Sequence, residues 1–214
     1  MVDVWSKGGT KGGASRPVSD TAIIEMGPDA ITIGVFTKDN SRSSSTIRSS
    51  FMPQIALEVF RALAPNLFSD ISGSSFTPTS IAAGEVFDVT TFIHNVGGGE
   101  CATGFDVTFY ASTNTTISEF DRPIATVRVP AIAPGSGRFA PYLGPFPDTV
   151  PPGTYYVGWI VDSAGANVIG EIGEWDETDN TGSITAYLLE VVDSQIFADG
   201  FESGHDGAWS AVVD

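Results

Sequence analysis

The most constraining feature of the sequence is a series of short β-type segments that begins near residue 67 and ends near residue 191. Each segment is rich in aromatic or β-branched residues, and Gly, Pro, Asn, Asp or Ser residues separate it from the next. The predicted strands cover residues 67–72, 85–94, 104–112, 123–129, 137–143, 153–161 and 183–191. Seven such strands within about 100 to 130 residues are typical of an antiparallel β-sandwich.

Alternation within two segments indicates which side chains face the core. Apolar residues alternate with Asp and Thr in 105–109, and they recur at every second position in 155–161. Because successive side chains of a strand point to opposite faces, we expect one buried and one solvated face in each. Trp159 falls on the buried face, so its predicted role is core packing rather than ligand binding.

Residues 1–64 follow a different pattern, and Ala64-Pro65-Asn66 separates them from the strand series. Apolar, β-branched runs at 21–26 and 31–37 flank a Gly-Pro-Asp turn sequence, which predicts a β-hairpin. Apolar residues at helical spacing predict a helix that ends at residue 64. One hairpin is a small sheet for a helix to cover, so we expect residues 1–64 to be the end of a domain that begins upstream.

The chain is strongly acidic, with a formal net charge of −16 and an isoelectric point of about 4.2. Such a field repels phosphate backbones and anionic lipid surfaces, so we expect no nucleic-acid partner. No apolar run approaches the roughly 20 residues of a membrane span, and Met1–Trp5 does not begin a signal peptide. If the protein is exported, its signal is missing from this chain.

Several motifs occur in a fixed order along the strand series. Pro65-Asn66-Leu67 opens it, Ile93-His94-Asn95-Val96-Gly97 ends the second strand, and Pro152-Gly153-Thr154-Tyr155 begins a later strand. The closing motif is Ile172-Gly173-Glu174-Trp175-Asp176-Glu177-Thr178-Asp179-Asn180. By these motifs residues 66–192 resemble the CARDB family of bacterial, cell-adhesion-related Ig-like domains, although Asp179 replaces an Asn of the family pattern.

The resemblance implies a mostly β, Ig-like, seven-stranded antiparallel sandwich outside the cell or on its surface. Its implied partner is a cell-surface, cell-wall or protein ligand, and it implies no catalysis by the sandwich itself. The resemblance gives no oligomeric state. Within the sandwich, Asn95 or Asn180 is expected to form an Asx-turn by bonding the backbone close to it.

The acidic segment near the end of the series has two interpretations that the sequence leaves open. In the first, its carboxylates form a solvated loop face. In the second they surround Ca²⁺, which takes 6 to 8 oxygen ligands, although the Asp spacing of an EF-hand is absent. The candidate calcium ligands are Asp162, Glu171, Glu174, Asp176 and Asp179.

The N-terminal region resembles the C-terminal end of a serine hydrolase of the β-lactamase and penicillin-binding class. Lys7-Gly8-Gly9-Thr10, the hairpin and the helix occur in the order of that family's Lys-[Thr/Ser]-Gly strand, two further strands and final helix. The resemblance implies that Lys7 lies beside the substrate carboxylate and that Gly8 and Gly9 let substrate lie along the strand. Gly8 departs from the usual Thr or Ser, and a flexible linker is the competing interpretation of Lys7–Gly13.

The nucleophile of that class lies in a Ser-x-x-Lys motif, and the sequence contains none. A serine needs its neighbouring base to attack an acyl centre, so we expect this chain alone to be inactive. Residues 193–214 form a short acidic tail, in which Phe197-Ala198-Asp199-Gly200-Phe201-Glu202-Ser203-Gly204 and Trp209-Ser210 resemble an ending of secreted bacterial proteins. The resemblance implies export or surface processing, and an acidic disordered end is the competing interpretation. The predicted function is therefore an extracellular adhesion, spacer or binding module; the alternatives are the end of a secreted serine hydrolase and a calcium-stiffened spacer.

Overall fold

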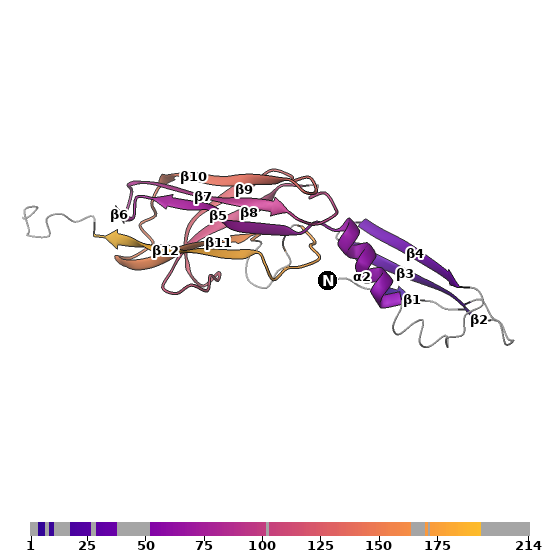
Figure 1. Ribbon diagram of the computed structural model, residues 1–214. Coiled ribbons are helices and arrows are strands. Elements are labelled where there is room, and N and C mark those ends of the chain that lie inside the picture. The colour runs from indigo at the N-terminus through magenta and orange to yellow at the C-terminus, as the bar shows by residue number, and fades with distance from the viewer. Residues whose placement is uncertain are drawn as a thin grey trace, which may run out of the picture.

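The computed structural model describes residues 4–6, 9–10, 18–26, 29–37, 52–101, 103–163, 170 and 172–193, with side chains from residue 53 onwards. Most of these residues lie in strands (Figure 1). Among them there is no helix with the length and hydrophobicity that a membrane crossing requires. The described residues do not include Lys7, Gly8, Glu171 or residues 194–214 of the acidic tail.

The strand series folds into two sheets that form an Ig-like β-sandwich. The three-stranded sheet has the order β10 (Gly137–Pro145), β7 (Val86–Asn95), β5 (Leu67–Thr77). The five-stranded sheet has the order β6 (Ser80–Ala82), β12 (Thr181–Val192), β11 (Gly153–Val161), β8 (Phe105–Ser112), β9 (Arg122–Val129). Neighbouring strands are antiparallel except β6 and β12.

All seven predicted strands are present, and β6 is an eighth that the sequence did not reveal. It is three residues long and pairs in parallel with the end of β12, at Ser80 opposite Glu190. The expectation of seven strictly antiparallel strands is therefore corrected to eight strands with one parallel pair. A strand this short is specified by its distant partner rather than by its own periodicity.

The core lies between the two sheets, where the inward side chains of both interdigitate. Its largest fully buried side chains are Trp159, Phe87, Phe105, Phe109 and Phe146. The inward positions of β8 and β11 are buried as predicted, and Trp159 is among them. The expected solvated face is corrected, because the outward Thr108 and Tyr110 of β8 are buried as well. Trp159 packs on Gly182 of β12, where an added Cβ would lie 2.5 Å from its ring.

A third sheet, of four strands, precedes the sandwich in the chain. In it β3 (Val18–Met26) pairs along its whole length with β4 (Asp29–Thr37), as the predicted hairpin requires. On its other edge β3 pairs with β1 (Val4–Ser6) and then with β2 (Gly9–Thr10). The predicted helix is α2 (Met52–Leu63), which lies against β3 and ends at the sandwich (Figure 1).

Candidate functional site

Three chain segments meet at the end of the sandwich next to α2: the start of β5, the end of β7 and the loop before β12. Polar side chains fill this place, which we call the polar corner. Its members are Asn66, Asn95, Glu174, Glu177, Asp179 and Asn180.

Asn95, at the end of β7, connects the start of β5 with the turn that follows β7 and with the loop between β9 and β10. Its Oδ1 accepts hydrogen bonds from the backbone N–H groups of Asn66 and Gly97, both at 3.1 Å. Its Nδ2 donates to the carbonyl oxygens of Gly99 at 2.8 Å and Ile132 at 3.0 Å. The Gly97 bond is the predicted Asx-turn, and the fully buried amide uses all four of its hydrogen-bonding positions.

Glu174 attaches the closing loop to the first strand. Its Oε2 accepts the backbone N–H of Leu67 at the start of β5, and its Oε1 accepts Nδ2 of Asn180 at 3.1 Å. The loop is held further because Glu177 Oε1 accepts the backbone N–H of Glu174 at 3.0 Å. The bond between Leu67 and Glu174 joins residues 107 positions apart, so the closing motif holds the opening one in place.

Asn66, just before β5, also bonds to the closing loop. Its Nδ2 donates to Asp179 Oδ2 at 3.0 Å, and its Oδ1 accepts the backbone N–H of Asp176 at 3.1 Å. Asp176 in turn accepts the backbone N–H and the hydroxyl of Thr178. Oδ1 of Asp179 and Oδ1 of Asn180 are buried without a hydrogen-bond partner among the described residues.

Burial determines the protonation of the corner. It raises the pKa of Glu174 to about 8, and the neighbouring Glu177 and Asp162 carboxylates add to the increase. Burial also raises the pKa of Glu177 and of Asp179. The pKa of Asp176, at the edge of the corner, shifts the other way, because the hydrogen bonds from Thr178 lower it. The corner is therefore a place where carboxyl groups hold protons more strongly than in water.

The acidic segment is not simply a solvated loop face, because Asp162 and Glu174 are both buried. Asp162 has a left-handed backbone with φ of 51°, and its Oδ2 accepts the backbone N–H of Ile172 at 2.9 Å. No three Asp, Glu, His or Cys side chains in the described part of the chain gather in a way that could hold a metal ion. The described candidate ligands, Asp162, Glu174, Asp176 and Asp179, form no such group, and each accepts a hydrogen bond from the chain itself.

Directly beside the polar corner, the end of α2 packs against the turn Gly97–Gly99 that follows β7; we call this contact the joint. A Cβ added at Gly98 would lie 2.1 Å from the carbonyl oxygen of Ala62, and one at Gly99 would lie 1.9 Å from that of Leu63. Only glycine allows the two backbones to approach so closely. The Gly99 N–H donates to the Ala64 carbonyl oxygen at 3.0 Å.

Apolar and aromatic contacts complete the joint. Ala56, Phe60 and Ala64 form a buried cluster on α2, and Trp175 from the closing loop packs against it. The Arg61 guanidinium lies 5.3 Å from the centre of the Trp175 ring, a cation–π distance. The backbone N–H of Trp175 also donates to the Pro65 carbonyl oxygen at 3.2 Å.

The outer faces of the two sheets differ. The loop after β8 covers part of the five-stranded sheet: Ile117 packs on Gly158, and Ser183 Oγ donates to the Thr115 carbonyl oxygen at 3.0 Å. The outer face of the three-stranded sheet instead carries aromatic and apolar side chains, which we call the aromatic face; Phe68, Phe139 and Leu143 are exposed, and Phe92 and His94 are half-buried. Its members are Phe68, Phe92, His94, Phe139 and Leu143.

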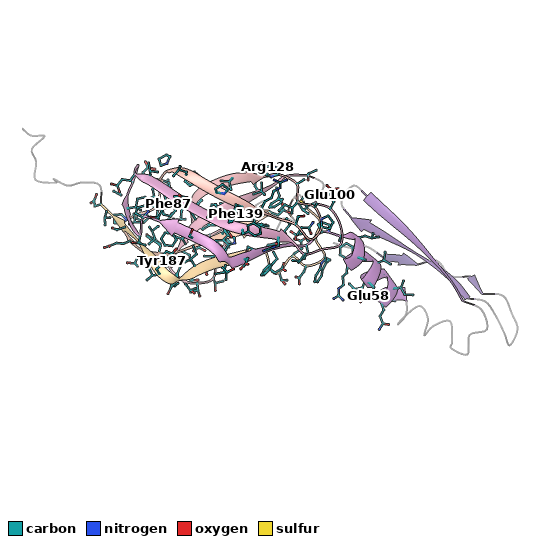
Figure 2. All side chains as sticks on the ribbon, turned by 45° about the horizontal axis from the view of Figure 1, so that its top comes forward. Glu58, Phe87, Glu100, Arg128, Phe139 and Tyr187 are labelled. Carbon is teal, nitrogen blue, oxygen red and sulfur yellow. The ribbon has the colours of Figure 1, made fainter. Side chains whose placement is uncertain are left out.

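The rings of the aromatic face form a row across the three strands. Phe92 of β7 lies 4.7 Å from Phe139 of β10 and 4.6 Å from His94, in edge-to-face geometry. Phe68 of β5 is the cross-strand neighbour of His94. Figure 2 turns this sheet toward the reader and labels Phe139, whose side chain is 58% exposed.

Of the predicted hydrolase motif, only part lies in the described residues. Gly9 and Thr10 form β2 and pair with Ser19 and Val18 of β3, while Lys7 and Gly8 lie outside the described residues. The joint and the aromatic face were missed at the sequence level. A signal existed for each: three consecutive glycines directly after a strand, and aromatic residues at outward positions of that same strand.

A comparison with family models matches CARDB to residues 64–183. No curated protein matches the chain. Among solved structures, the CARDB domain of the PF1109 protein from Pyrococcus furiosus, determined in complex with di-metal ions, is 15% identical, with 60% of this chain and 90% of that chain covered and a TM-score of 0.40.

Two similar structures are longer enzymes. A β-glucosidase from Erythrobacter marinus is 15% identical over 60% of this chain and 16% of its own, with a TM-score of 0.36. A β-glucosidase from Listeria innocua in complex with glucose is 14% identical over 59% of this chain and 16% of its own, with a TM-score of 0.34.

Proposed function

The chain belongs to the CARDB family through residues 64–183, and we propose that it is an adhesion-related module that works outside the cell as a rigid spacer. The observation that carries the proposal is the joint. Gly97–Gly99 and Trp175 pack against the end of α2. The sandwich is therefore attached to the preceding unit by packing contacts as well as by the chain. A spacer of this kind fixes the orientation of what it carries as well as the distance.

The connection between α2 and β5 supports this function. Only residues 64–66 separate the two elements, and the backbone of each is hydrogen-bonded. The carbonyl oxygens of Ala64, Pro65 and Asn66 accept hydrogen bonds from Gly99, Trp175 and Val96 respectively. A flexible linker would instead be Gly- and Ser-rich with its backbone exposed to water.

The test is a distance measurement between spin labels on the two sides of the joint in the whole chain. Glu58 on α2, labelled in Figure 2, and Asp88 on β7 are exposed, and replacing both by Cys gives two labelling sites. The native Cys101 is buried. We expect one narrow distance distribution. A matched variant with Gly-Ser-Gly-Ser inserted after Leu63 is expected to give a broad one. A distribution in the unmodified chain as broad as that of the insertion variant would refute the rigid spacer.

A second candidate is that residues 1–64 are the C-terminal end of a secreted β-lactamase-type serine hydrolase whose nucleophile lies upstream. The order of elements favours it: an interrupted edge strand β1–β2, the hairpin β3–β4, and α2 against β3. A serine-reactive acyl probe is expected to label a longer protein and to leave this chain unlabelled. Labelling of this chain would show that a nucleophile is present.

Stiffening by calcium stays a prediction, because Glu171 lies outside the described residues. A ligand that binds only the folded state raises the melting temperature by mass action. If calcium stiffens the spacer, millimolar CaCl₂ raises the melting temperature of the chain and EDTA reverses the increase, whereas the same concentration of NaCl does not.

A further inference from the structure

The aromatic face is a surface that the described chain leaves uncovered. Phe139 is 58% and Leu143 is 71% exposed, and Phe68 on the far strand of the same sheet is also exposed. The equivalent face of the other sheet is partly covered by the loop that carries Ile117. Contiguous exposed apolar surface of this kind marks an interaction site in soluble proteins.

The strands are arranged so that the central ring can lie between them. A Cβ added at Gly137 of β10 would lie 2.3 Å from Cε1 of Phe92, and one at Gly73 of β5 would lie 2.7 Å from Cβ of Phe92. Glycine at these two positions therefore leaves room for the Phe92 ring beside β10 and for its Cβ beside β5. Phe92 in this position supports Phe139, whose ring lies at 74° to it.

The charges on and around the face are negative. Asp70 and Asp88 lie on its strands, and Asp88 is the cross-strand neighbour of Leu143. His94 lies 3.8 Å from Asp70 and is the only basic side chain on the face. The described arginines are used elsewhere: Arg61 pairs with Glu58, Arg128 with Asp106, and Arg138 donates to the Ala131 carbonyl oxygen, while Arg122 begins β9 of the other sheet.

From this geometry we propose that the aromatic face docks a protein whose contact surface has an apolar centre and a basic rim. The rings supply the apolar contact that interface centres use, and the acidic rim with a chain charge of −16 selects a cationic partner. A second copy of this chain would bring two acidic rims together, and that repulsion opposes self-association through this face. The inference does not depend on whether the joint is rigid.

The test uses the whole chain and three synthetic decapeptides that alternate Leu with Lys, Leu with Glu, and Ser with Lys. Binding is measured by fluorescence anisotropy of the labelled peptides. We expect the Leu–Lys peptide to bind and the other two to bind at least about tenfold more weakly, because each lacks either the charge or the apolar side chains. Raising NaCl from 0.05 to 0.5 M is expected to weaken binding of the Leu–Lys peptide by about tenfold or more.

Two variants locate the binding. Phe139→Ala removes an exposed ring from the face and is expected to weaken the Leu–Lys peptide by about tenfold. Phe120→Ala removes a ring that is even more exposed, 87% accessible, from the loop over the other sheet and is expected to leave binding of the Leu–Lys peptide unchanged. Equal binding by wild type and Phe139→Ala would overturn the proposal, because charge alone would then explain the affinity.

Two further outcomes would overturn the choice of partner. In sedimentation equilibrium, a dimer that Phe139→Ala abolishes would make a second copy the occupant. Depletion of the wild type, but not of Phe139→Ala, by an insoluble uncharged β-glucan would make the occupant a polysaccharide. A monomeric chain that ignores the glucan and binds the Leu–Lys peptide through Phe139 is the result that supports the proposal.

Discussion

Asn95 shows how a single side chain can hold the end of the sandwich together. It bonds the backbone of β5, of its own turn and of the loop at Ile132, all without access to water. We expect Asn95→Ala to lower the free energy of unfolding by about 3 kcal/mol or more, because it leaves buried N–H and C=O groups without partners. Urea denaturation followed by tryptophan fluorescence measures the change.

Asn114→Ala is the matched control for that variant. Asn114 also forms an Asx-type bond, from the Thr116 N–H to its Oδ1 at 2.8 Å, but it lies in an exposed turn where water replaces the lost bond. Its expected cost is below about 1 kcal/mol. Equal costs for the two variants would mean that burial of the Asn95 network contributes nothing.

Glu174 makes stability depend on pH in the direction opposite to the usual carboxylate. Its pKa is raised to about 8 in the fold from an ordinary value of 4.5, so between these two values the folded state binds a proton that the unfolded state has released. The contribution of this group is therefore fully present below about pH 4.5 and is lost as pH rises toward 8. One pKa unit corresponds to about 1.4 kcal/mol, which sets an upper limit of about 5 kcal/mol on the loss.

Measurement of the urea midpoint at pH 5, 6, 7 and 8 tests this expectation. Glu177 and Asp179 have pKa values raised by burial as well, so they act in the same direction as Glu174. The midpoint is expected to fall with pH in the wild type and to fall less steeply in Glu174→Gln, which cannot ionise. A wild-type midpoint that stays constant over this interval would show that the corner carboxyls are already ionised in the fold.

At the residue scale the sequence predicted local bonds well and distant ones poorly. The Asx-turn at Asn95 needs only Gly97 two positions later, so its prediction was confirmed. The burial of Glu174 depends on Leu67, 107 positions earlier, and no local pattern reports such a contact. The interpretation of the acidic segment as a solvated face was wrong for Glu174 for this reason.

At the scale of elements, periodicity was sufficient for the long strands and the helix. Their buried faces repeat every second residue or with helical spacing, and each was predicted within a few residues of its observed bounds, with β5 longer than expected. β6 escaped because three residues cannot show a period and its partner is the parallel end of β12. The joint escaped because its glycines matter only for what lies opposite them, the last turn of α2.

The helix itself supplies a prediction about the joint. Phe60 is buried against the sandwich end and Leu57 is partly exposed, so Phe60→Ala removes packing at the joint and Leu57→Ala removes little. We expect Phe60→Ala to speed amide exchange of Gly99 and Trp175, whose N–H groups bond to the carbonyl oxygens of Ala64 and Pro65, by about tenfold or more. The amide of Val157 in the sandwich core is the internal reference, and it is expected to keep its protection. Equal exchange in the Phe60 and Leu57 variants would separate the helix from the joint.

At the scale of the whole molecule, contacts cross the boundary that the sequence marks after α2. Sequence texture changes at Ala64-Pro65-Asn66, and the family match begins at residue 64. Yet the carbonyl oxygens of residues 64 and 65 accept hydrogen bonds from the sandwich, and Trp175 lies on the helix cluster. The helix belongs energetically to both the unit that precedes it and the sandwich that follows.

A comparison of two fragments decides where that boundary lies. A chain of residues 66–193 loses the carbonyl acceptors for the Gly99 and Trp175 N–H groups and exposes Trp175 to water. A chain of residues 52–193 keeps both acceptors and the helix that covers Trp175. We therefore expect the shorter fragment to melt about 5 °C or more below the longer one. Gly98→Ala supplies a second test. In the 52–193 fragment the added methyl group forces α2 away from the turn, so the melting temperature of that fragment should fall toward that of the 66–193 fragment. In the 66–193 fragment, which lacks Ala62, the substitution should have little effect. If both fragments melt together and Gly98→Ala acts equally in each, the helix rests on the sandwich without stabilising it, and a rigid mount would have to come from elsewhere in the chain.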